Sequence, residues 1–189
     1  AKTLQCPTGM VLKRTARFPR NSIKRGGKIR GRKAIALAKS GKAFCVDAYE
    51  YPGRGSRPRV NVTFEGARAL CAQVNKRLCT SSEWGRSCRG KRRSAFPYGK
   101  SFNAKKCNTE DENGDERRIR PAGSFRKCRS PGGVYDMSGN VAEWTSDKRV
   151  FGGYYASVDE EAACNAGDRY SPTSKRTFIG FRCCSDFRE

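Results

Sequence analysis

Ten cysteines and no histidine in a chain of 189 residues constrain the fold and its chemistry more than any other feature. An even number of cysteines without a C-x-x-C spacing is typical of a disulfide-braced domain. The competing interpretation is zinc held by cysteines alone, but the adjacent Cys183 and Cys184 are poorly placed to chelate one ion. Without imidazole, Ser-His-Asp and Cys-His catalysis are excluded. The cysteines are Cys6, Cys45, Cys71, Cys79, Cys88, Cys107, Cys128, Cys164, Cys183 and Cys184.

Such a density of cysteines favours an oxidising compartment, so we expect the protein to be secreted or periplasmic. The chain begins at Ala1, and no charged segment followed by an apolar one comes after it. If the protein is secreted, we therefore expect that a signal peptide has already been removed. The longest apolar run is only a few residues, which is too short for a helix that spans a bilayer.

Basic residues dominate the beginning of the chain. There are 40 Lys and Arg against 18 Asp and Glu, a formal net charge of +22, and no acidic residue precedes Asp47. Glycines interrupt the basic stretch 24–33, so we predict an exposed arm there, with a short helix at 33–39. We divide the chain into a basic N-terminal segment, 1–43, partly flexible but tethered through Cys6, and a globular domain, 44–189.

This charge is expected to attract polyanions with a strength that falls as salt rises. Extracytoplasmic candidates are lipopolysaccharide, a wall polymer, an acidic glycan or released DNA, and an acidic protein is the other partner class. A cytosolic nucleic-acid binder would explain the charge but not ten cysteines. The alternative is that the positive field only keeps the domain soluble. The residues predicted to bind the polyanion are Lys24, Arg25, Lys28, Arg30, Arg32, Lys33, Arg89, Lys91, Arg92 and Arg93.

The globular part alternates short strand and helix signals with long loops. Residues 44–51 predict a strand that ends at a Pro-Gly turn. Thr63 is a candidate cap for a helix over 64–75, and Thr80 or Ser81 opens a second helix with Glu83 placed as in a capping box. Glycine, proline, asparagine and aspartate recur over 90–140, so this region needs covalent staples. The fold class predicted is an irregular, loop-rich and disulfide-braced α+β domain.

Several short segments, taken in order, resemble one enzyme family. The most distinctive is Gly133-Val134-Tyr135-Asp136-Met137-Ser138-Gly139-Asn140-Val141-Ala142-Glu143-Trp144-Thr145. The others are Cys6-Pro7-Thr8-Gly9-Met10-Val11, Phe44-Cys45-Val46-Asp47, Tyr49-Glu50-Tyr51-Pro52, Lys76-Arg77-Leu78-Cys79-Thr80 with Glu83-Trp84, Cys88-Arg89-Gly90, Phe96-Pro97-Tyr98-Gly99, Gly152-Gly153 and Gly180-Phe181-Arg182-Cys183. Over about 44–184 the chain thus resembles the formylglycine-generating enzymes, or sulfatase-modifying factor domains, which implies a C-type-lectin-like fold.

The resemblance also says where catalytic thiols would stand. Enzymes of the family hold copper(I) with two cysteines placed shortly after Gly-Gly. Aligned on Gly152-Gly153, those positions are Ser157 and Ala162, and a hydroxyl and a methyl do not hold copper(I). Copper is therefore not expected and the oxidase activity is expected to be lost, although a misplaced gap would bring Cys164 into play. The ergothioneine-type branch binds iron through histidine and is excluded.

A calcium site is also implied by the resemblance. Carried over, the ligands are the side chains of Asp136 and Glu143 and the carbonyls of Gly139 and Val141, since calcium prefers hard oxygen ligands. The alternative is a turn with one capping aspartate and a solvated glutamate. A second calcium would fall at Asn108 and the loop after it. That loop holds the acidic cluster Glu110, Asp111, Glu112, Asp115 and Glu116, which alternatively pairs with nearby arginines.

Disulfide pairings follow in part from the same resemblance, which implies Cys88–Cys183 and Cys107–Cys164. Two further pairs, Cys71–Cys79 and Cys45–Cys184, are guesses from expected proximity. A redox-active pair at Cys183-Cys184 is the functional alternative, although vicinal disulfides are strained.

Two functions remain from the sequence. The first is a secreted or periplasmic, non-catalytic, calcium-containing domain whose basic face binds an anionic polymer or an acidic protein. The second is a divergent copper-dependent oxidase that acts on a protein cysteine. Free thiols in the native protein would separate the two.

Overall fold

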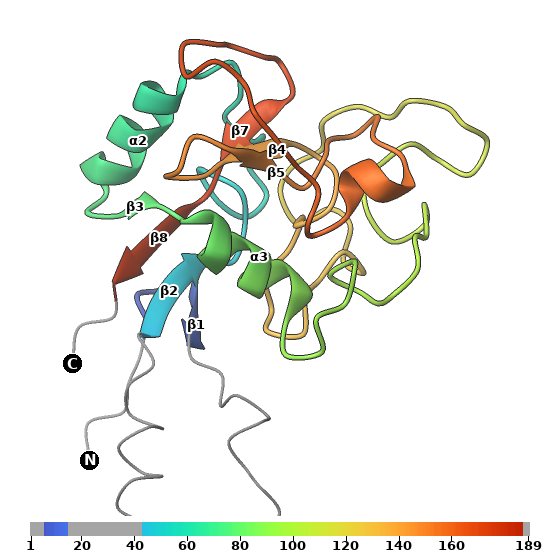
Figure 1. Ribbon diagram of the computed structural model, residues 1–189, viewed down its shortest axis with the longest axis horizontal. Helices are drawn as coiled ribbons and strands as arrows, with labels where there is room; N and C mark the ends of the chain where they lie inside the picture. The colour runs from blue at the N-terminus through green and yellow to red at the C-terminus, as the bar shows by residue number, and fades with distance from the viewer. Residues whose placement is uncertain (1–5, 15–42, 187–189) are drawn as a thin grey trace, which may run out of the picture.

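The computed structural model describes residues 6–14 and 43–186. The expected helix at 33–39 and the predicted polyanion-binding residues between Lys24 and Lys33 lie outside these ranges. Within them, short strands and two α-helices are joined by long loops, as Figure 1 shows. The predicted loop-rich α+β class is confirmed. No helix of the described residues is long and apolar enough to cross a membrane.

The first sheet has the order β1-β2-β8-β3, and all its pairs are antiparallel. Its strands are β1 (Met10–Arg14), β2 (Ala43–Asp47), β3 (Arg77–Leu78) and β8 (Cys183–Asp186). Met10 pairs with Asp47 and Arg14 with Ala43, so β1 and β2 form one continuous ladder. Part of the segment assigned to 1–43 therefore belongs to the sheet of the domain.

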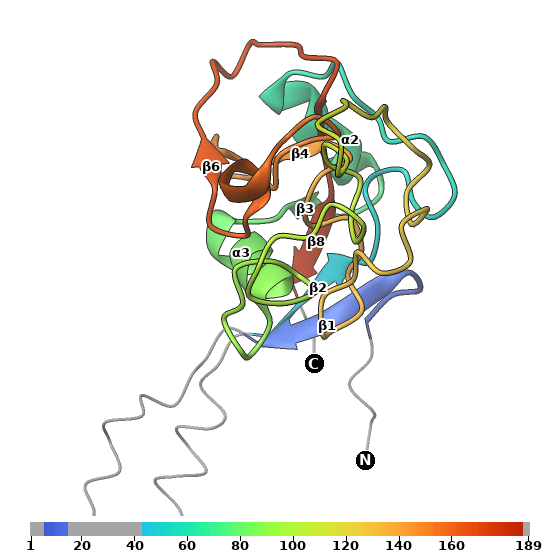
Figure 2. The same ribbon diagram turned by 90° about the vertical axis from the view of Figure 1, so that its right-hand side faces the viewer.

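The second sheet has the order β6-β5-β4-β7, with β4 and β7 parallel. Its strands are β4 (Ala142–Trp144), β5 (Val150–Phe151), β6 (Gly167–Asp168) and β7 (Ile179–Phe181). A single residue, Arg182, separates β7 from β8, so it links the two sheets. In Figure 2, β4 and β6 of the second sheet lie above β2 and β1 of the first, and β6 is the edge strand.

Both helices begin where their caps predict. Helix α2 (Phe64–Gln73) starts after Thr63, whose side chain accepts a hydrogen bond from the Gly66 amide. Helix α3 (Ser81–Arg89) starts after Thr80 and has the complete capping box with Glu83. A 3₁₀ helix, η2 (Asp159–Ala162), lies in the later loops. The predicted strand over 44–51 is shorter than expected, because pairing ends at Asp47.

All ten cysteines form disulfides, but none of the four expected pairings is correct. The bonds are Cys6–Cys45, Cys71–Cys183, Cys79–Cys184, Cys88–Cys164 and Cys107–Cys128. Expected were Cys88–Cys183, Cys107–Cys164, Cys71–Cys79 and Cys45–Cys184. Successive side chains of a strand point to opposite faces, so Cys183 reaches α2 while Cys184 reaches the residue after β3. Cys183 and Cys184 are therefore not bonded to each other.

Candidate functional site

The turn before β4 has an unusual backbone. Asp136, Gly139 and Asn140 all have positive φ, at 55°, 78° and 61°. A Cβ on Gly139 would lie 2.2 Å from the carbonyl oxygen of Asn108, so glycine is required there. The turn buries Asp136 and leads directly to Glu143, which is buried on β4.

Glu143 forms a buried, two-point ion pair with Arg182. Arg182 Nη2 lies 2.6 Å from Glu143 Oε1, and Arg182 Nε lies 2.7 Å from Oε2. Trp84 Nε1 donates to the same Oε2 over 2.7 Å. Arg182 also donates to the carbonyl oxygens of Asp47 and Tyr135, so its guanidinium joins both sheets and the loop before β4. Such geometry is what a fully desolvated ion pair requires.

Two more carboxyl groups belong to this buried network. Glu50 accepts hydrogen bonds from Asn140 Nδ2 and from the Val141 amide. Burial raises the pKa of Glu50 well above its usual value, and the charges of Asp136 and Glu143 raise it further. Burial likewise raises the pKa of Asp136 to about 6, although Gly123 donates to its Oδ2. Three buried carboxyl groups thus lie around one arginine, and burial favours the protonated form of Glu50.

The residues expected to bind calcium lie in this network. Asp136 and Glu143 interact electrostatically, but both Glu143 oxygens already accept from Arg182 and Trp84. Among the described residues, no group of three or more Cys, Asp or Glu side chains is arranged to hold a metal ion. The expected calcium ligands include only two such side chains, because the other two ligands are backbone carbonyls. The calcium site therefore stays a prediction.

Asn108, expected at the second calcium, lies against the same turn. Its Nδ2 donates to the Arg118 carbonyl and to Asn140 Oδ1, while its own Oδ1 is buried without a hydrogen-bond partner. A buried oxygen without a donor fits the side-chain ligand of a hard cation. In the acidic loop beyond it, Glu112 pairs with Lys105 and Arg117 at 3.4 and 3.6 Å. The alternative of local pairing is therefore realised for that residue.

The two positions where the resemblance places thiols are both buried. Ser157 Oγ accepts a hydrogen bond from the Tyr154 amide, which closes the turn after Gly152-Gly153. Ala162 ends η2, and its carbonyl accepts from Ser138 Oγ. Cys164 is bonded to Cys88 on α3, and no cysteine of the chain is free. The region holds neither a thiol pair nor a single thiol.

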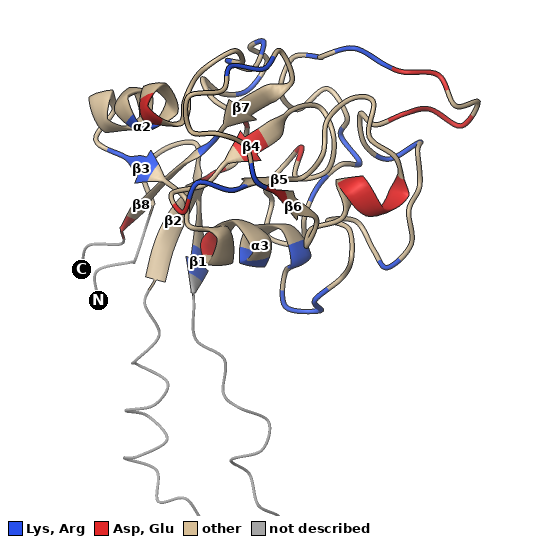
Figure 3. Cartoon of the chain, turned by 45° about the horizontal axis from the view of Figure 1, so that its top comes forward, with Lys and Arg blue, Asp and Glu red and all other residues tan. Residues whose placement is uncertain are grey.

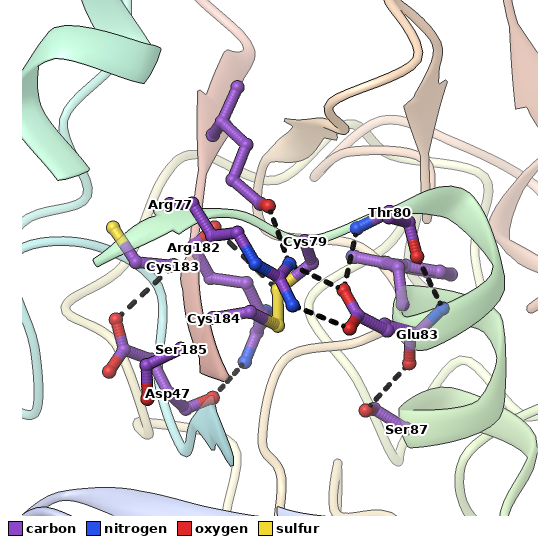
Figure 4. Close-up of a disulfide and its surroundings, with 12 residues drawn as sticks. Asp47, Arg77, Cys79, Thr80, Glu83, Ser87, Arg182, Cys183, Cys184 and Ser185 are labelled. Atoms are coloured by element: carbon purple, nitrogen blue, oxygen red, sulfur yellow. Dashed lines mark hydrogen bonds and ion pairs between the residues drawn. A yellow bond between two sulfur atoms is a disulfide. The ribbon is translucent and has the colours of Figure 1, made fainter. Parts of the chain in front are cut away.

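A second ionic cluster surrounds the Cys79–Cys184 bond (Figure 4). Arg77 donates two hydrogen bonds of 2.7 Å to Glu83 and two to Asp186. Burial alone would raise the pKa of Glu83, but the bonds from Arg77 and Thr80 bring it below its usual value. The cluster therefore fixes the start of α3 against β8, and its sulfurs are buried.

Basic side chains gather at the C-terminal end of α3. Burial lowers the pKa of Arg86, and the charges of Arg89 and Arg93 lower it further, so these guanidinium groups lie close together. Lys91, Arg92 and Arg93 are exposed in the following turn. Figure 3 shows blue at the end of α3 and in the loop that follows it. In the described part of the chain, Arg89 and these three residues form no ion pair. We name the exposed set of Lys91, Arg92 and Arg93, together with Arg89, the α3 basic turn.

Two residues of the buried network were not singled out from the sequence. Glu50 and Arg182 stand in family segments, Tyr49-Glu50-Tyr51-Pro52 and Gly180-Phe181-Arg182-Cys183, but charged residues in such short segments are usually exposed. The one indication in the sequence was that Glu50 and Arg182 each stand within a short strand-like segment of largely apolar residues. Only the crossing of the two sheets shows that both are buried.

Comparison with known proteins agrees with this architecture. A sulfatase-modifying factor enzyme 1-like domain matches residues 33–187. An inactive C-alpha-formylglycine-generating enzyme 2 of Bos taurus is 32% identical over 164 residues, which cover 71% of this chain and 54% of that protein. The formylglycine-generating enzyme of Mus musculus is 28% identical over 171 residues, covering 70% and 45%. The chain spans between about a quarter and about half the length of the curated relatives it matches.

Among solved structures, PvdO from Pseudomonas aeruginosa has a similar fold. Its TM-score is 0.65 at 19% sequence identity, and the match covers 76% of this chain and 80% of that one. At this identity the likeness concerns the fold alone.

Proposed function

The chain belongs to the family of sulfatase-modifying factor enzyme 1-like domains, and from that premise we propose that it uses the scaffold to bind rather than to oxidise. In this proposal it is a secreted or periplasmic, non-catalytic domain. Its basic surface binds an anionic polymer, with an acidic protein as the other partner class. The disulfides suit an extracytoplasmic location, because they persist in oxidising compartments.

One observation carries the proposal: every cysteine is bonded to another cysteine. The oxidase chemistry that the family implies depends on two thiols that hold copper(I), a soft ion that prefers sulfur. At the corresponding positions this chain has the hydroxyl of Ser157 and the methyl of Ala162, neither of which is a ligand for it. The residues present therefore do not fit copper(I).

A divergent oxidase is the second candidate, and the position of Cys164 favours it. This residue stands two positions after Ala162, so opening its bond to Cys88 would release a thiol close to the expected place. Both sulfurs are buried, however, and the bond closes a loop with a sequence separation of 76. Opening a native bond of this kind costs roughly 2–5 kcal/mol.

The α3 basic turn supports the binding function. Arg89 is half-buried and held by its own helix, since its Nε donates to the Gly85 carbonyl. The three exposed side chains beside it are free of carboxylates in the described structure and are available to sulfate, phosphate or carboxylate groups. A bound polyanion would relieve the electrostatic repulsion between these crowded guanidinium groups, which favours binding.

Replacing Lys91, Arg92 and Arg93 together with glutamine should weaken retention on dextran sulfate. At about 0.1 M salt the dissociation constant should rise roughly tenfold, and the slope of its logarithm against that of salt should fall by about 2. The matched control replaces the exposed Arg57, Arg59 and Arg169 with glutamine, which gives the same net charge. Equal weakening in both variants would mean that overall charge acts rather than this turn. Absence of retention by the native protein at low salt would contradict polymer binding.

We also propose that a structural calcium ion binds at residues 136–143. The buried network has three carboxyl groups and one guanidinium, so a divalent cation would offset the mutual repulsion of the ionised carboxylates. The Asp136 carboxylate and the carbonyls of Gly139 and Val141 supply the hard oxygens, while Glu143 would share an oxygen with Arg182. At Asn108 the unpartnered Oδ1 supports a second ion, although the acidic loop beyond it is partly neutralised by Lys105 and Arg117.

A further inference from the structure

A surface cavity of about 410 Å³ lies where the turn before β1, the loop after β2 and the end of α2 meet. Its wall includes Thr8, Tyr49, Tyr51, Arg54, Val74 and Lys76. The volume is within the range of small-molecule sites. The cavity shares no residue with the α3 basic turn, and it shares one with the buried network around Glu143, namely Asp47, whose carbonyl accepts from Arg182. Neither proposed function uses the cavity.

Two tyrosines give the cavity an aromatic wall. Tyr49 stacks on Tyr135 with ring centroids 4.8 Å apart, and Tyr51 stacks on Phe181 at 4.7 Å. Each ring thus has one face covered by a neighbouring ring, and both side chains remain half-exposed where they line the cavity. Rings fixed in this way offer a flat apolar surface at little cost in conformational entropy.

One of the two basic side chains that line the cavity has no acidic partner among the described residues. Lys76 Nζ lies 2.6 Å from Asp47 Oδ1, so this pair is neutral as a unit. Arg54 is exposed, and among the described residues no carboxylate pairs with it. It lies close enough to Tyr49 for its charge to lower the pKa of that phenol, against the larger effect of burial. A ligand with a single negative charge would complete the site.

Disulfides hold the walls in place. Cys6–Cys45 joins the segments that lead to Thr8 and Asp47, and Cys71–Cys183 anchors the end of α2 just before Val74. Val74 is 45% exposed, unusually high for a large apolar side chain in this domain. A rigid cavity with an exposed apolar edge is preorganised for a ligand, since little must be ordered on binding.

We propose that this cavity binds a single acidic sugar unit, that is, a pyranose with a carboxylate. The apolar face of the sugar ring would pack on the tyrosine wall, and the carboxylate would accept two hydrogen bonds from the Arg54 guanidinium. The hydroxyl groups of the sugar would meet polar groups of the Asp47–Lys76 pair and of Thr8. A simple anion would leave the aromatic wall unused, and a neutral sugar would leave Arg54 without a partner.

Titration of the intact protein with D-glucuronic acid, followed by NMR, tests the proposal. We expect millimolar binding, with amide shifts at Gly53, Arg54 and Val74, and at least tenfold weaker binding of D-glucose and of acetate, because each lacks one half of the recognition. Arg54→Gln should weaken the binding of glucuronic acid by about tenfold. Arg57→Gln removes the same charge three residues away and should leave it unchanged. Val74→Phe, at an exposed position that tolerates a larger side chain, should weaken binding by narrowing the cavity.

Absence of shifts with glucuronic acid would overturn the proposal. So would equal affinity for glucose or acetate, or equal effects of Arg54→Gln and Arg57→Gln. The outcome is separable from the proposed polymer binding, because Arg54→Gln should change dextran sulfate retention no more than Arg57→Gln does. If the native protein binds glucuronic acid but is not retained on dextran sulfate, only the polymer-binding function is contradicted.

Discussion

Replacing Arg182 with methionine should lower the free energy of unfolding by about 3–5 kcal/mol, measured by urea unfolding in the presence of a chelator. The substitution keeps much of the side-chain volume but leaves the buried Glu143 carboxylate with only Trp84 Nε1 as a donor. It also removes the hydrogen bonds that Arg182 donates to the carbonyls of Asp47 and Tyr135. An uncompensated buried charge and two lost hydrogen bonds act in the same direction.

Arg68→Met provides the matched control. Arg68 pairs with Glu65 on α2, but both side chains are more than 60% exposed, so the loss should stay below about 1 kcal/mol. Arg182→Lys keeps the charge without the two-point geometry and should fall between the two, which gives a measurable value even if the methionine variant does not fold. Losses that are equal in Arg182→Met and Arg68→Met would show that the buried pair does not hold the two sheets together.

Calcium should raise the thermal stability of the native protein if the proposed ion binds at the turn before β4. A ligand that binds only the folded state at about 100 times its dissociation constant adds roughly 2.7 kcal/mol. For a domain of this size we expect a rise in the melting temperature of about 5–10 °C over that in chelator. The physical reason is that the ion would offset the repulsion between the negative charges of Asp136 and Glu143.

Asp136→Asn should abolish this stabilisation by calcium, because it replaces a charged carboxylate ligand of the ion with a neutral amide. Asp168→Asn removes an exposed acid on β6 and should leave the response intact. Identical melting curves of the native protein in calcium and in chelator would show that the turn holds no ion, and that Arg182 alone compensates the carboxylates.

Local features of the fold were predictable because their causes are local. Thr63 and Thr80 begin their helices through side-chain bonds to amides three residues on, and Glu83 completes a capping box that the spacing already indicates. Helical spacing predicts a buried stripe on α2 at Ala67, Leu70, Cys71 and Val74. Ala67 and Cys71 are buried, but Val74 is 45% exposed because the helix ends at Gln73.

Disulfide connectivity and the buried network depend on contacts between distant segments. Whether Cys183 bonds Cys71 or Cys88 is decided by which face of β8 it occupies, and this register is not encoded in the spacing of the cysteines. Likewise, Arg182 is buried because one residue links two sheets, a position that no window of neighbouring residues identifies. The family resemblance placed the expected thiols at Ser157 and Ala162, and in the structure these residues close the turn after Gly152-Gly153 and end η2. The two bridges that it implied, Cys88–Cys183 and Cys107–Cys164, are wrong.

Counting thiols in the native and in the unreduced, unfolded protein tests most directly whether the scaffold binds rather than reacts. With all ten cysteines paired, we predict no alkylated cysteine in either state and a Cys88–Cys164 peptide in the unreduced digest. Two alkylated thiols at Cys88 and Cys164, together with stoichiometric binding of copper(I), would contradict the account and restore the oxidase.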